Sequence, residues 1–396
     1  MMGPLRLAWK YVCFHKAKSL ILIACIVLTT ILPVAVKLLV WQFDQKIVAR
    51  AASTPSIVGA KGSSLDLVLS ALYFKQGAAN PVPYSEVERA RGDGLATAIP
   101  LHCRFTAMGY PVVGTSLEYF GYRGLEAVDG SLFVSLGDCV VGHKVAEMLS
   151  VGVGDRLISD RDNVLDLAGQ SPLKLNVAGV LGASRTPDDW AVFVDLKTAW
   201  VIQGLGHGHQ DLNKESADSP VLLSNESGKI IANRGVVSYI EITDENIDSF
   251  HFHGDTGEFP VTAVLVAAHG FKEETILQGR YESSESEVQF VRPEIVVRDL
   301  MTIVFQVNRF FNANAILIAG STAMLMVLVV LLSLRLRKRE METMFRLGCS
   351  RGTIAWLQIG EMGIIFGFSM VFVLMGCGWV WMVSGDIVEG LLVNAR

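Results

Sequence analysis

The chain has 396 residues, of which only 18% are charged, a formal net charge of −5 and a mean hydropathy of +0.40. This composition is too apolar for an ordinary soluble protein of this size. The slightly acidic balance gives no indication of nucleic-acid binding, so we expect no nucleic-acid partner.

Three stretches contain enough apolar residues to cross a bilayer, for which a helix needs about 20. They are Leu20–Trp41, Ala315–Leu334 and Ile354–Val383. The first stretch is longer than the apolar region of a signal peptide, usually about 7–15 residues, so we interpret it as an uncleaved anchor. We predict three transmembrane helices.

Lys and Arg residues in the short connecting segments predict the orientation of these helices. The N-terminal tail and the segment between the second and third helices are rich in basic residues, whereas the C-terminal tail is mainly acidic. We therefore expect the tail and the basic segment in the cytoplasm, and the large domain and the C-terminus outside. The predicted order is tail 1–19, helix 20–41, domain 42–314, helix 315–334, loop 335–353, helix 354–383 and tail 384–396.

The large domain shows the mixed patterns of an α+β fold. "CVVGHKVAEMLSVGVGDRL", Cys139–Leu157, predicts a strand end, a short helix through Val145–Leu149 and a Gly-Asp turn into another strand. Leu173–Leu181 alternates like a strand, and Trp190–Gln203 predicts a strand followed by a helix. Helical patterns continue past the first apolar run and precede the second, so both membrane helices are expected to extend outward as stalks.

The segment between the second and third apolar stretches, "LRLRKREMETMFRLGCSRGTI", is dense in charge. Met341, Met344 and Phe345 recur at helical spacing, Gly348 suits the position after a helix end, and Ser350 is a candidate N-cap for the next helix. We predict a short amphipathic helix under the membrane. Its apolar face could contact a cytoplasmic partner or lie on lipid headgroups.

"RKREMETMFRLGCSRGTI" resembles the segment R-x-R-E-x-x-x-L-x-x-L-G-A-S-x-x-x-I of ABC-transporter permeases of the FtsX, LolC/LolE and MacB type. Cys139–Leu157 is similar to the periplasmic core pattern V-x-G-x-x-x-A-x-x-L-x-x-x-x-G-D-x-L of these proteins. In that family the first segment contacts the ATPase subunit. The matched positions, together with the apolar residues of the predicted helix Met341–Leu347, are Arg337, Arg339, Glu340, Met341, Met344, Phe345, Leu347, Gly348, Ser350 and Arg351.

The resemblance implies a multi-pass permease subunit in a bacterial inner membrane, with a MacB-like periplasmic core domain. It also implies a cytoplasmic ABC ATPase dimer, a second copy or a homologous permease, and a periplasmic adaptor, lipoprotein or binding protein as partners. Such a chain transmits motion to the outer domain to export or extract an envelope substrate. The family usually has a fourth membrane helix, and this chain ends soon after its third, so we expect a three-helix variant.

Sequence motifs for catalysis are absent. The chain has no G-x-x-x-x-G-K-[ST] loop for a nucleotide phosphate and no recognisable signature of a catalytic triad. We therefore expect a non-catalytic subunit that binds no cofactor, with ATP and Mg²⁺ in the partner chain. Two alternative functions remain open: an FtsX-like transmitter that controls a periplasmic partner, and a permease of a zinc-linked envelope system.

Histidines and isolated charges are the other candidate sites. "GLGHGHQD" contains His207 and His209, and "SFHFHGD" contains His251 and His253. Two residues apart in a strand, both imidazoles of a pair would lie on one face, an arrangement that a metal site such as a zinc site could use, with Asp211 and Asp255 two residues beyond each pair; solvated loop histidines are the alternative.

Three further sequence features belong to the spans and to the outer domain. Lys37 and Glu361 lie near the ends of predicted spans, where Glu361 could reach headgroups, pair with an Arg or serve in transport. Cys103 and Cys139 fall in the outer domain, where a disulfide could form.

Overall fold

The computed structural model describes residues 2–160, 172–208, 222–226, 229–232, 240–282, 287–336 and 338–393. The chain divides into two compact units, one formed by Met1–Gln45 with Leu300–Val388 and the other centred on Lys46–Asp299. His209, Asp211 and Arg337, which the sequence analysis singled out, lie outside the described residues.

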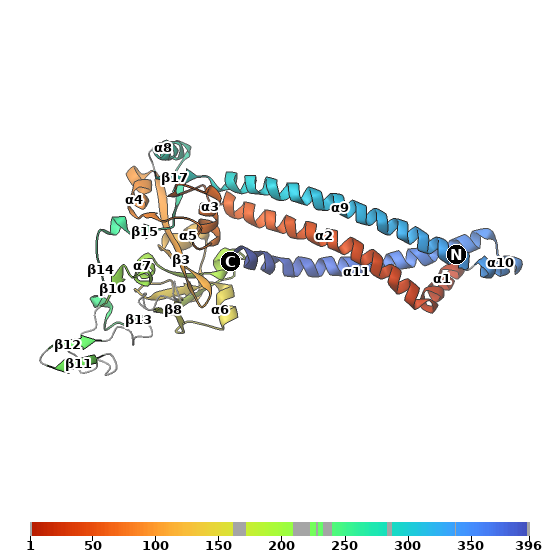
Figure 1. Ribbon diagram of the computed structural model, residues 1–396, viewed down its shortest axis with the longest axis horizontal. Helices are drawn as coiled ribbons and strands as arrows, with labels where there is room; N and C mark the ends of the chain where they lie inside the picture. The colour runs from red at the N-terminus through yellow and green to blue at the C-terminus, as the bar shows by residue number, and fades with distance from the viewer. Residues whose placement is uncertain are drawn as a thin grey trace. The chain divides into compact units, whose positions relative to one another are not determined.

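The second unit is built on one mixed sheet (Figure 1). Across the part of the chain that the structure describes, the strand order is β13-β8-β6-β9-β4-β3-β16-β1-β17, and β5 and β7 also pair with β8. These strands are β1 Ser56–Ala60, β3 Ala96–Ala107, β4 Tyr110–Thr115, β5 Ala127–Gly130, β6 Asp138–Val141, β7 Arg156–Ile158, β8 Leu173–Leu181, β9 Val192–Asp195, β13 Ile240–Glu241, β16 Ala263–Ala268 and β17 Val288–Val291.

Short helices and three small strand pairs complete this unit. The pairs are β2 Val82–Pro83 with β15 Pro260–Val261, β10 Gly206–His207 with β14 His251–Phe252, and β11 Leu222–Glu226 with β12 Lys229–Ala232. The helices are α3 Ser64–Tyr73, α4 Ser85–Arg91, α5 Glu118–Arg123, α6 His143–Leu149, α7 Leu196–Gln203 and α8 Phe271–Tyr281, with 3-10 turns η1 Gly92–Gly94, η2 Pro187–Trp190, η5 Ile247–Ser249 and η6 Thr256–Glu258.

Local sequence explains several of these elements. β8 has the predicted bounds, and its side chains alternate between buried and half-buried, as a strand with one face on the core requires. β9 runs directly into α7, whose N-cap Asp195 accepts a hydrogen bond from Lys197 N and whose C-terminus ends at the left-handed Gly204. The predicted strand-helix-strand order of Cys139–Leu157 is confirmed by β6, α6 and β7.

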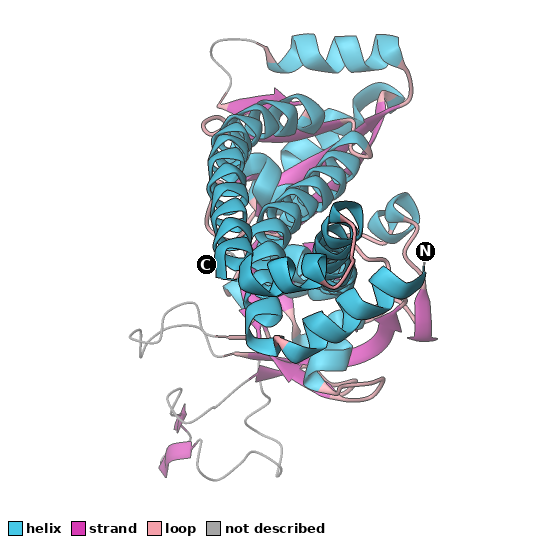
Figure 2. Cartoon of the chain, turned by 90° about the vertical axis from the view of Figure 1, so that its right-hand side faces the viewer, coloured by secondary structure: helices cyan, strands magenta, loops and turns pink. Residues whose placement is uncertain are grey.

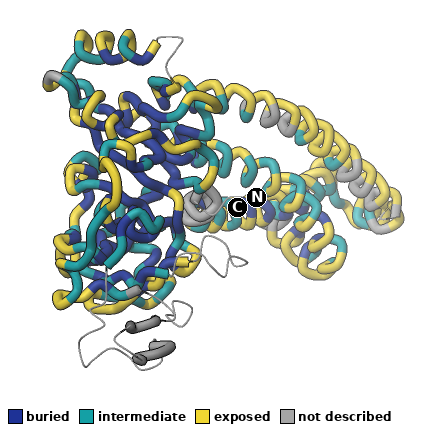
Figure 3. The backbone as a smooth tube through the Cα atoms, turned by 60° about the vertical axis from the view of Figure 1, so that its left-hand side comes forward, coloured by how far each residue is buried: buried dark blue, intermediate teal, exposed yellow. Residues whose placement is uncertain are grey.

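Buried aromatic rings form the centre of the domain. Phe193 of β9 packs against Phe74, Tyr119 and Phe120, with ring centroids between 5.5 and 5.9 Å apart. Figure 3 shows the buried residues, in dark blue, concentrated in the interior of this unit. Cys103 and Cys139 lie within this interior as free thiols, so they do not form the disulfide considered from sequence. Burial raises the pKa of both thiols.

The first unit consists of helices, and three long ones run alongside one another (Figure 2). The helices that contribute to this unit are α1 Met2–Phe14, α2 Lys16–Ala52, α9 Pro293–Leu336, α10 Lys338–Arg346 and α11 Arg351–Val393, of which α2, α9 and α11 are the long ones. Both predicted extensions are confirmed as helix, because α2 and α9 each continue without interruption beyond the apolar runs. α11 continues past Val383 to Val393, where a tail was expected.

Two helices among the described residues are long and apolar enough to cross a membrane, within Lys16–Ala52 and Arg351–Gly385. The predicted span 315–334 lies inside α9, in which Ala313–Met324 is a shorter apolar stretch, so its membrane crossing stays a prediction. Large apolar side chains such as Phe366, Val371 and Trp379 are exposed along α11. A lipid environment would cover such a surface, which is costly to leave in water.

Candidate functional site

The charged segment folds as the short helix α10 between the long helices α9 and α11 (Figure 1). Met341 and Met344 are half-buried, whereas Phe345 is 51% exposed and Leu347 is 80% exposed. Arg339 is exposed, and Glu340 lies within the helix. Phe345 of α10 and Leu347, which directly follows the helix, are therefore two large exposed apolar side chains in a mostly charged segment.

The turn after α10 has the predicted local chemistry. Gly348 has a φ of +93°, a conformation that costs glycine least, and Cys349 N donates to Met344 O. Ser350 caps α11, because its Oγ accepts a hydrogen bond from Thr353 N at 3.1 Å. The Arg351 guanidinium lies over the Phe345 ring, 5.6 Å from its centroid, so the two ends of the turn contact each other.

Glu361 is buried within the helical unit, with a side chain only 1% exposed. Its Oε1 lies 3.0 Å from Lys18 Nζ, so the ion pair joins α11 to the start of α2. The pairing with an Arg considered from sequence is therefore replaced by a pairing with a Lys. Lys37 is exposed on α2. A paired carboxylate between two helices acts as a structural contact, since burial without a partner would be costly.

A second contact joins α2 to α11. Gln42 donates to Trp381 O at 3.4 Å and accepts from Ser384 Oγ at 2.6 Å, while the Trp41 and Trp381 rings stack with centroids 5.6 Å apart. Polar groups inside a helical bundle favour a defined pairing, because each needs its partner when water is excluded.

The sequence analysis did not predict a buried ion pair between Arg50 and Asp188, which lies in the second unit at the end of α2. Arg50 binds both carboxylate oxygens of Asp188, at 2.7 and 2.8 Å, and donates to Tyr119 Oη at 2.9 Å. Tyr119 Oη in turn donates to Asp188 Oδ1 at 2.6 Å, and Thr186 Oγ1 donates to Asp188 Oδ2. The only sequence signal was a pair of acids, Asp188 and Asp189, in a loop next to buried strand residues.

A neighbouring charge and hydrogen bonds keep the Asp188 carboxyl group of this ion pair ionised. Burial alone would raise the pKa of Asp188, but the charge of Arg50 and hydrogen bonds from Arg50 and Tyr119 hold it below its usual range. Burial raises the pKa of the Tyr119 hydroxyl. The last turn of α2 is therefore bonded through a bidentate, water-excluded ion pair to the loop that precedes β9.

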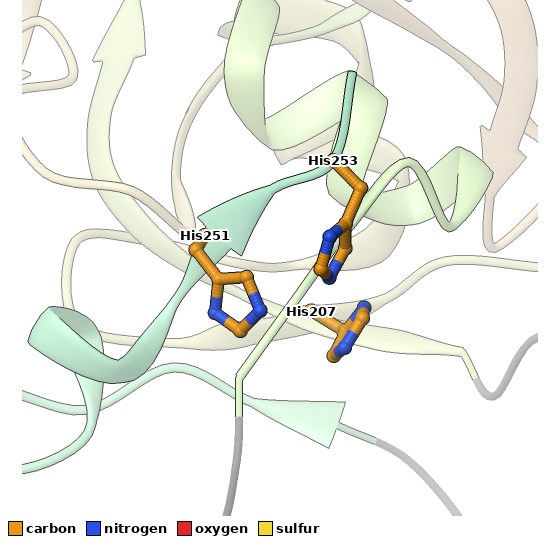
Figure 4. Close-up of side chains that lie close together, drawn as sticks. All are labelled: His207, His251 and His253. Atoms are coloured by element: carbon orange, nitrogen blue, oxygen red, sulfur yellow. The ribbon is translucent and has the colours of Figure 1, made fainter.

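Three of the four predicted histidines come together in the second unit. His207 belongs to β10 and His251 to β14, and His253 follows one residue after β14 (Figure 4). One ring nitrogen from each residue lies within 4.8 Å of the others. Asp255, considered as a further ligand, instead caps η6 by accepting from Gly257 N at 2.9 Å.

Comparisons with known proteins give distant structural likeness alone. The sequence matches no protein-family model, and no curated protein matches it. The periplasmic region of MacB from Actinobacillus actinomycetemcomitans is similar with a TM-score of 0.37 and 10% identity, covering 65% of this chain and 98% of that one. The extracellular domain of the noncanonic ABC-type transporter YknZ from Gram-positive bacteria is similar with a TM-score of 0.31 and 11% identity, covering 60% of this chain and 99% of that one.

Likeness at these scores does not by itself establish a shared fold or activity, so the functional proposal rests on the residues of this chain. Those residues define a class: a mixed α/β domain joined to helices that include two long and apolar enough to cross a membrane.

Proposed function

We propose that this chain is the permease subunit of an ABC transporter, in which a separate ATPase supplies the energy and this chain carries the motion to an outer domain. The observation that carries the proposal is α10, a charged helix between two long apolar helices, with Phe345 exposed on it and Leu347 exposed directly after it. The segment that resembles the ATPase-contacting segment of FtsX, LolC/LolE and MacB permeases covers this helix.

The continuity of two long helices supports the proposed transmission of motion. α2 and α9 are single helices that each contribute residues to both units. Inside the second unit, Arg50 bonds the end of α2 to Asp188. A displacement of α10 by the ATPase would act on α9, which precedes α10 in the chain and continues into the domain as a single helix.

The spans favour transmission of motion over passage through a polar pore. The three predicted spans contain no Asp, Glu, Lys or Arg apart from Lys37 and Glu361, and Glu361 is paired with Lys18. A hydrophilic path usually requires several ionisable groups that face a water-filled cavity. The substrate would accordingly be handled by the outer domain, in complexes that contain two permease chains and two ATPase chains.

Phe345→Asp tests the proposed contact. The new carboxylate would have to be buried against the apolar surface of the ATPase, at a cost above the roughly 2–7 kcal/mol of burying an unpaired amide or hydroxyl, so the ATPase should no longer co-purify. The matched control is Thr343→Asp, which adds the same charge to the same helix at an exposed position. Residues two apart on a helix do not share a face, so the control should leave the contact intact.

The measurement is affinity purification of the tagged full chain from its native membrane, followed by mass spectrometry and an ATPase assay. Wild type and Thr343→Asp should each recover an ABC ATPase, and Phe345→Asp should lose at least 90% of it while still inserting in the membrane. Equal recovery with both variants would mean that this face of α10 contacts lipid. Recovery of no ATPase with wild type would overturn the transporter proposal itself.

A further inference from the structure

The second unit carries a group of imidazoles that the proposed transport function does not use. His207 and His251 stand directly opposite each other in the β10–β14 pair, and His253 follows two residues after His251. The centroids of the three rings are between 4.7 and 5.0 Å apart. Figure 4 shows the three side chains gathered at one place, with two contributed by the segment around β14 and one by β10.

Alternation along the strand explains why the histidines share a face. Phe250 and Phe252 alternate with His251 and His253, and both phenylalanines pack against the hydrophobic core of the domain. Phe252 lies against Trp200 and Phe259, with ring centroids 6.4 and 6.0 Å apart. Because successive side chains in a strand point to opposite faces, the packing of the partly buried phenylalanine rings directs the imidazoles away from the core.

Glycines on either side of His207 make room for the Phe250 and Phe252 rings. A Cβ at Gly206 would lie 2.6 Å from Phe252 Cε1, and a Cβ at Gly208 would lie 2.6 Å from Phe250 Cε2. A larger residue on either side of His207 would therefore clash with a phenylalanine ring of the segment that carries the other two histidines. The Gly-His-Gly sequence and the alternating Phe and His residues are complementary parts of one packing arrangement.

A backbone hydrogen bond of His251 determines which of its two ring nitrogens could bind a metal ion. His251 Nδ1 lies 3.0 Å from Ser249 O, and a carbonyl oxygen can only accept a hydrogen bond. Nδ1 therefore carries a proton, and Nε2 is the nitrogen with which this ring would bind a metal ion. In metal sites, a backbone carbonyl commonly orients a ligating imidazole in this way through the nitrogen that does not bind the metal.

We propose that His207, His251 and His253 bind a zinc ion, or a similar transition-metal ion, through three imidazole nitrogens. In a tetrahedral site with Zn–N distances of about 2.0–2.1 Å, the nitrogens are roughly 3.3 Å apart. The observed limit of 4.8 Å is close enough for small side-chain rotations to bring them to that spacing.

The kind of ligand also determines which ions the site would select. Imidazole donors favour zinc, copper or nickel over Mg²⁺ and Ca²⁺, which prefer oxygen ligands. With three protein ligands, the fourth position is left for water or a ligand from outside the site. A bound ion would tie the two short strands β10 and β14 together. The site is independent of the proposed transport function, since it uses no residue of α10 or of the long helices.

Zinc titration of the metal-free full chain in detergent, by calorimetry, tests the proposal. Wild type should bind one equivalent with a dissociation constant in the micromolar range or below. His251→Ala and His207→Ala should each weaken that binding at least tenfold. The matched control is His143→Ala, which removes a half-buried imidazole of the same domain outside the group, and it should bind like wild type. Unchanged affinity in His251→Ala and His207→Ala would overturn the proposal.

A second variant covers the case in which a substitution in the strand pair disturbs folding. His253 is exposed, so His253→Gln should leave the metal-free melting temperature unchanged. Zinc should raise the melting temperature of wild type and of His143→Ala, but not that of His253→Gln, because an ion stabilises only a folded state that binds it. An equal rise in all three proteins, or an equal rise with Mg²⁺, would contradict a zinc site at these residues.

Discussion

Arg50 shows how one residue can join a long helix to a domain. Its guanidinium and the Asp188 carboxylate are both almost completely buried and make a bidentate pair. Removing one partner of a buried pair leaves the other charge uncompensated, which costs more than losing a surface pair. The Tyr119 hydroxyl would lose a partner at the same time, because Arg50 also donates to it.

For Arg50→Met we expect the free energy of unfolding of the domain to fall by about 3–5 kcal/mol. Arg156→Met is the control, because Arg156 pairs with Glu241 at 2.8 Å with its side chain half exposed, and such pairs contribute about 0–1 kcal/mol. Urea titration of both variants in detergent, followed by Trp fluorescence, measures the difference. Similar losses of unfolding free energy in the two variants would show that the Arg50–Asp188 pair is not the main contact that holds the end of α2 in the domain.

His102 makes the stability of the domain depend on pH. It is buried in β3, and burial lowers its pKa from 6.5 to about 4, with the charge of Arg104 acting in the same direction and a nearby Gln203 opposing it. Below pH 6.5 the unfolded chain binds a proton at His102, whereas the folded chain does so only near pH 4. Stability from this residue is therefore lost as the pH falls through that window.

The expected loss between pH 7 and pH 4 is about 3 kcal/mol for this residue, since one pKa unit corresponds to about 1.4 kcal/mol. His102→Gln should lack this part of the pH dependence, while His269→Gln, at an exposed histidine, should retain it. Urea titrations at pH 7 and at pH 4 measure this loss of unfolding free energy for each protein. Parallel pH profiles for His102→Gln and wild type would show that another group is responsible.

At the scale of single elements, close packing between α2 and α11 depends on a glycine. A Cβ on Gly376 would overlap Cδ1 of Ile31, whereas a Cβ on Gly378 would meet nothing within 4 Å. Small residues let membrane helices approach closely, so a large side chain at Gly376 must separate them or force Ile31 to move.

Gly376→Leu should therefore destabilise the helical unit by about 1–3 kcal/mol, and Gly378→Leu should have little effect on packing. Cysteines placed at Trp41 and Trp381, whose rings stack, provide a direct measurement by disulfide crosslinking. Crosslinking should decrease in the Gly376→Leu background and persist with Gly378→Leu. If both backgrounds crosslink equally, the contact between these helices does not require a glycine at position 376.

Local patterns predicted elements well wherever neighbouring residues determine the structure. The alternation in Leu173–Leu181 gave β8 with its bounds, and Ser350 was identified as a cap from its position before an apolar run. Sheet order could not be derived in this way. β1 lies between β16 and β17, more than 200 residues later in the chain, and nothing in its five residues specifies those neighbours.

The candidate sites likewise depend on long-range contacts that the local sequence does not specify. Two His-x-His pairs suggested a metal site, but only the pairing of β10 with β14 brings His207 to His251 and His253. Arg50 and Asp188 are 138 residues apart, so their ion pair has no local signature. The Glu361 partner, Lys18, is 343 residues away and was not considered in advance.

At the scale of the whole molecule, the basic segments predict which parts face the cytoplasm. In a chain without native cysteines, Glu342→Cys should be protected from a membrane-impermeant maleimide in intact cells. Ser150→Cys, on the surface of the domain, and Asn394→Cys should both be labelled, because two of the three predicted spans separate the domain from the C-terminus and would place both on the same side. Labelling of position 342, or protection of 394 alone, would contradict the predicted topology.

The two thiols inside the domain have a consequence for how the protein tolerates oxidising and reducing conditions. Thiolates are the reactive form of cysteine, and Cys103 and Cys139 are both buried with raised pKa values. Neither should exchange with glutathione or be readily oxidised by peroxide while the domain stays folded. Maturation of the domain would then need no disulfide isomerase, and its melting temperature should be the same with and without dithiothreitol.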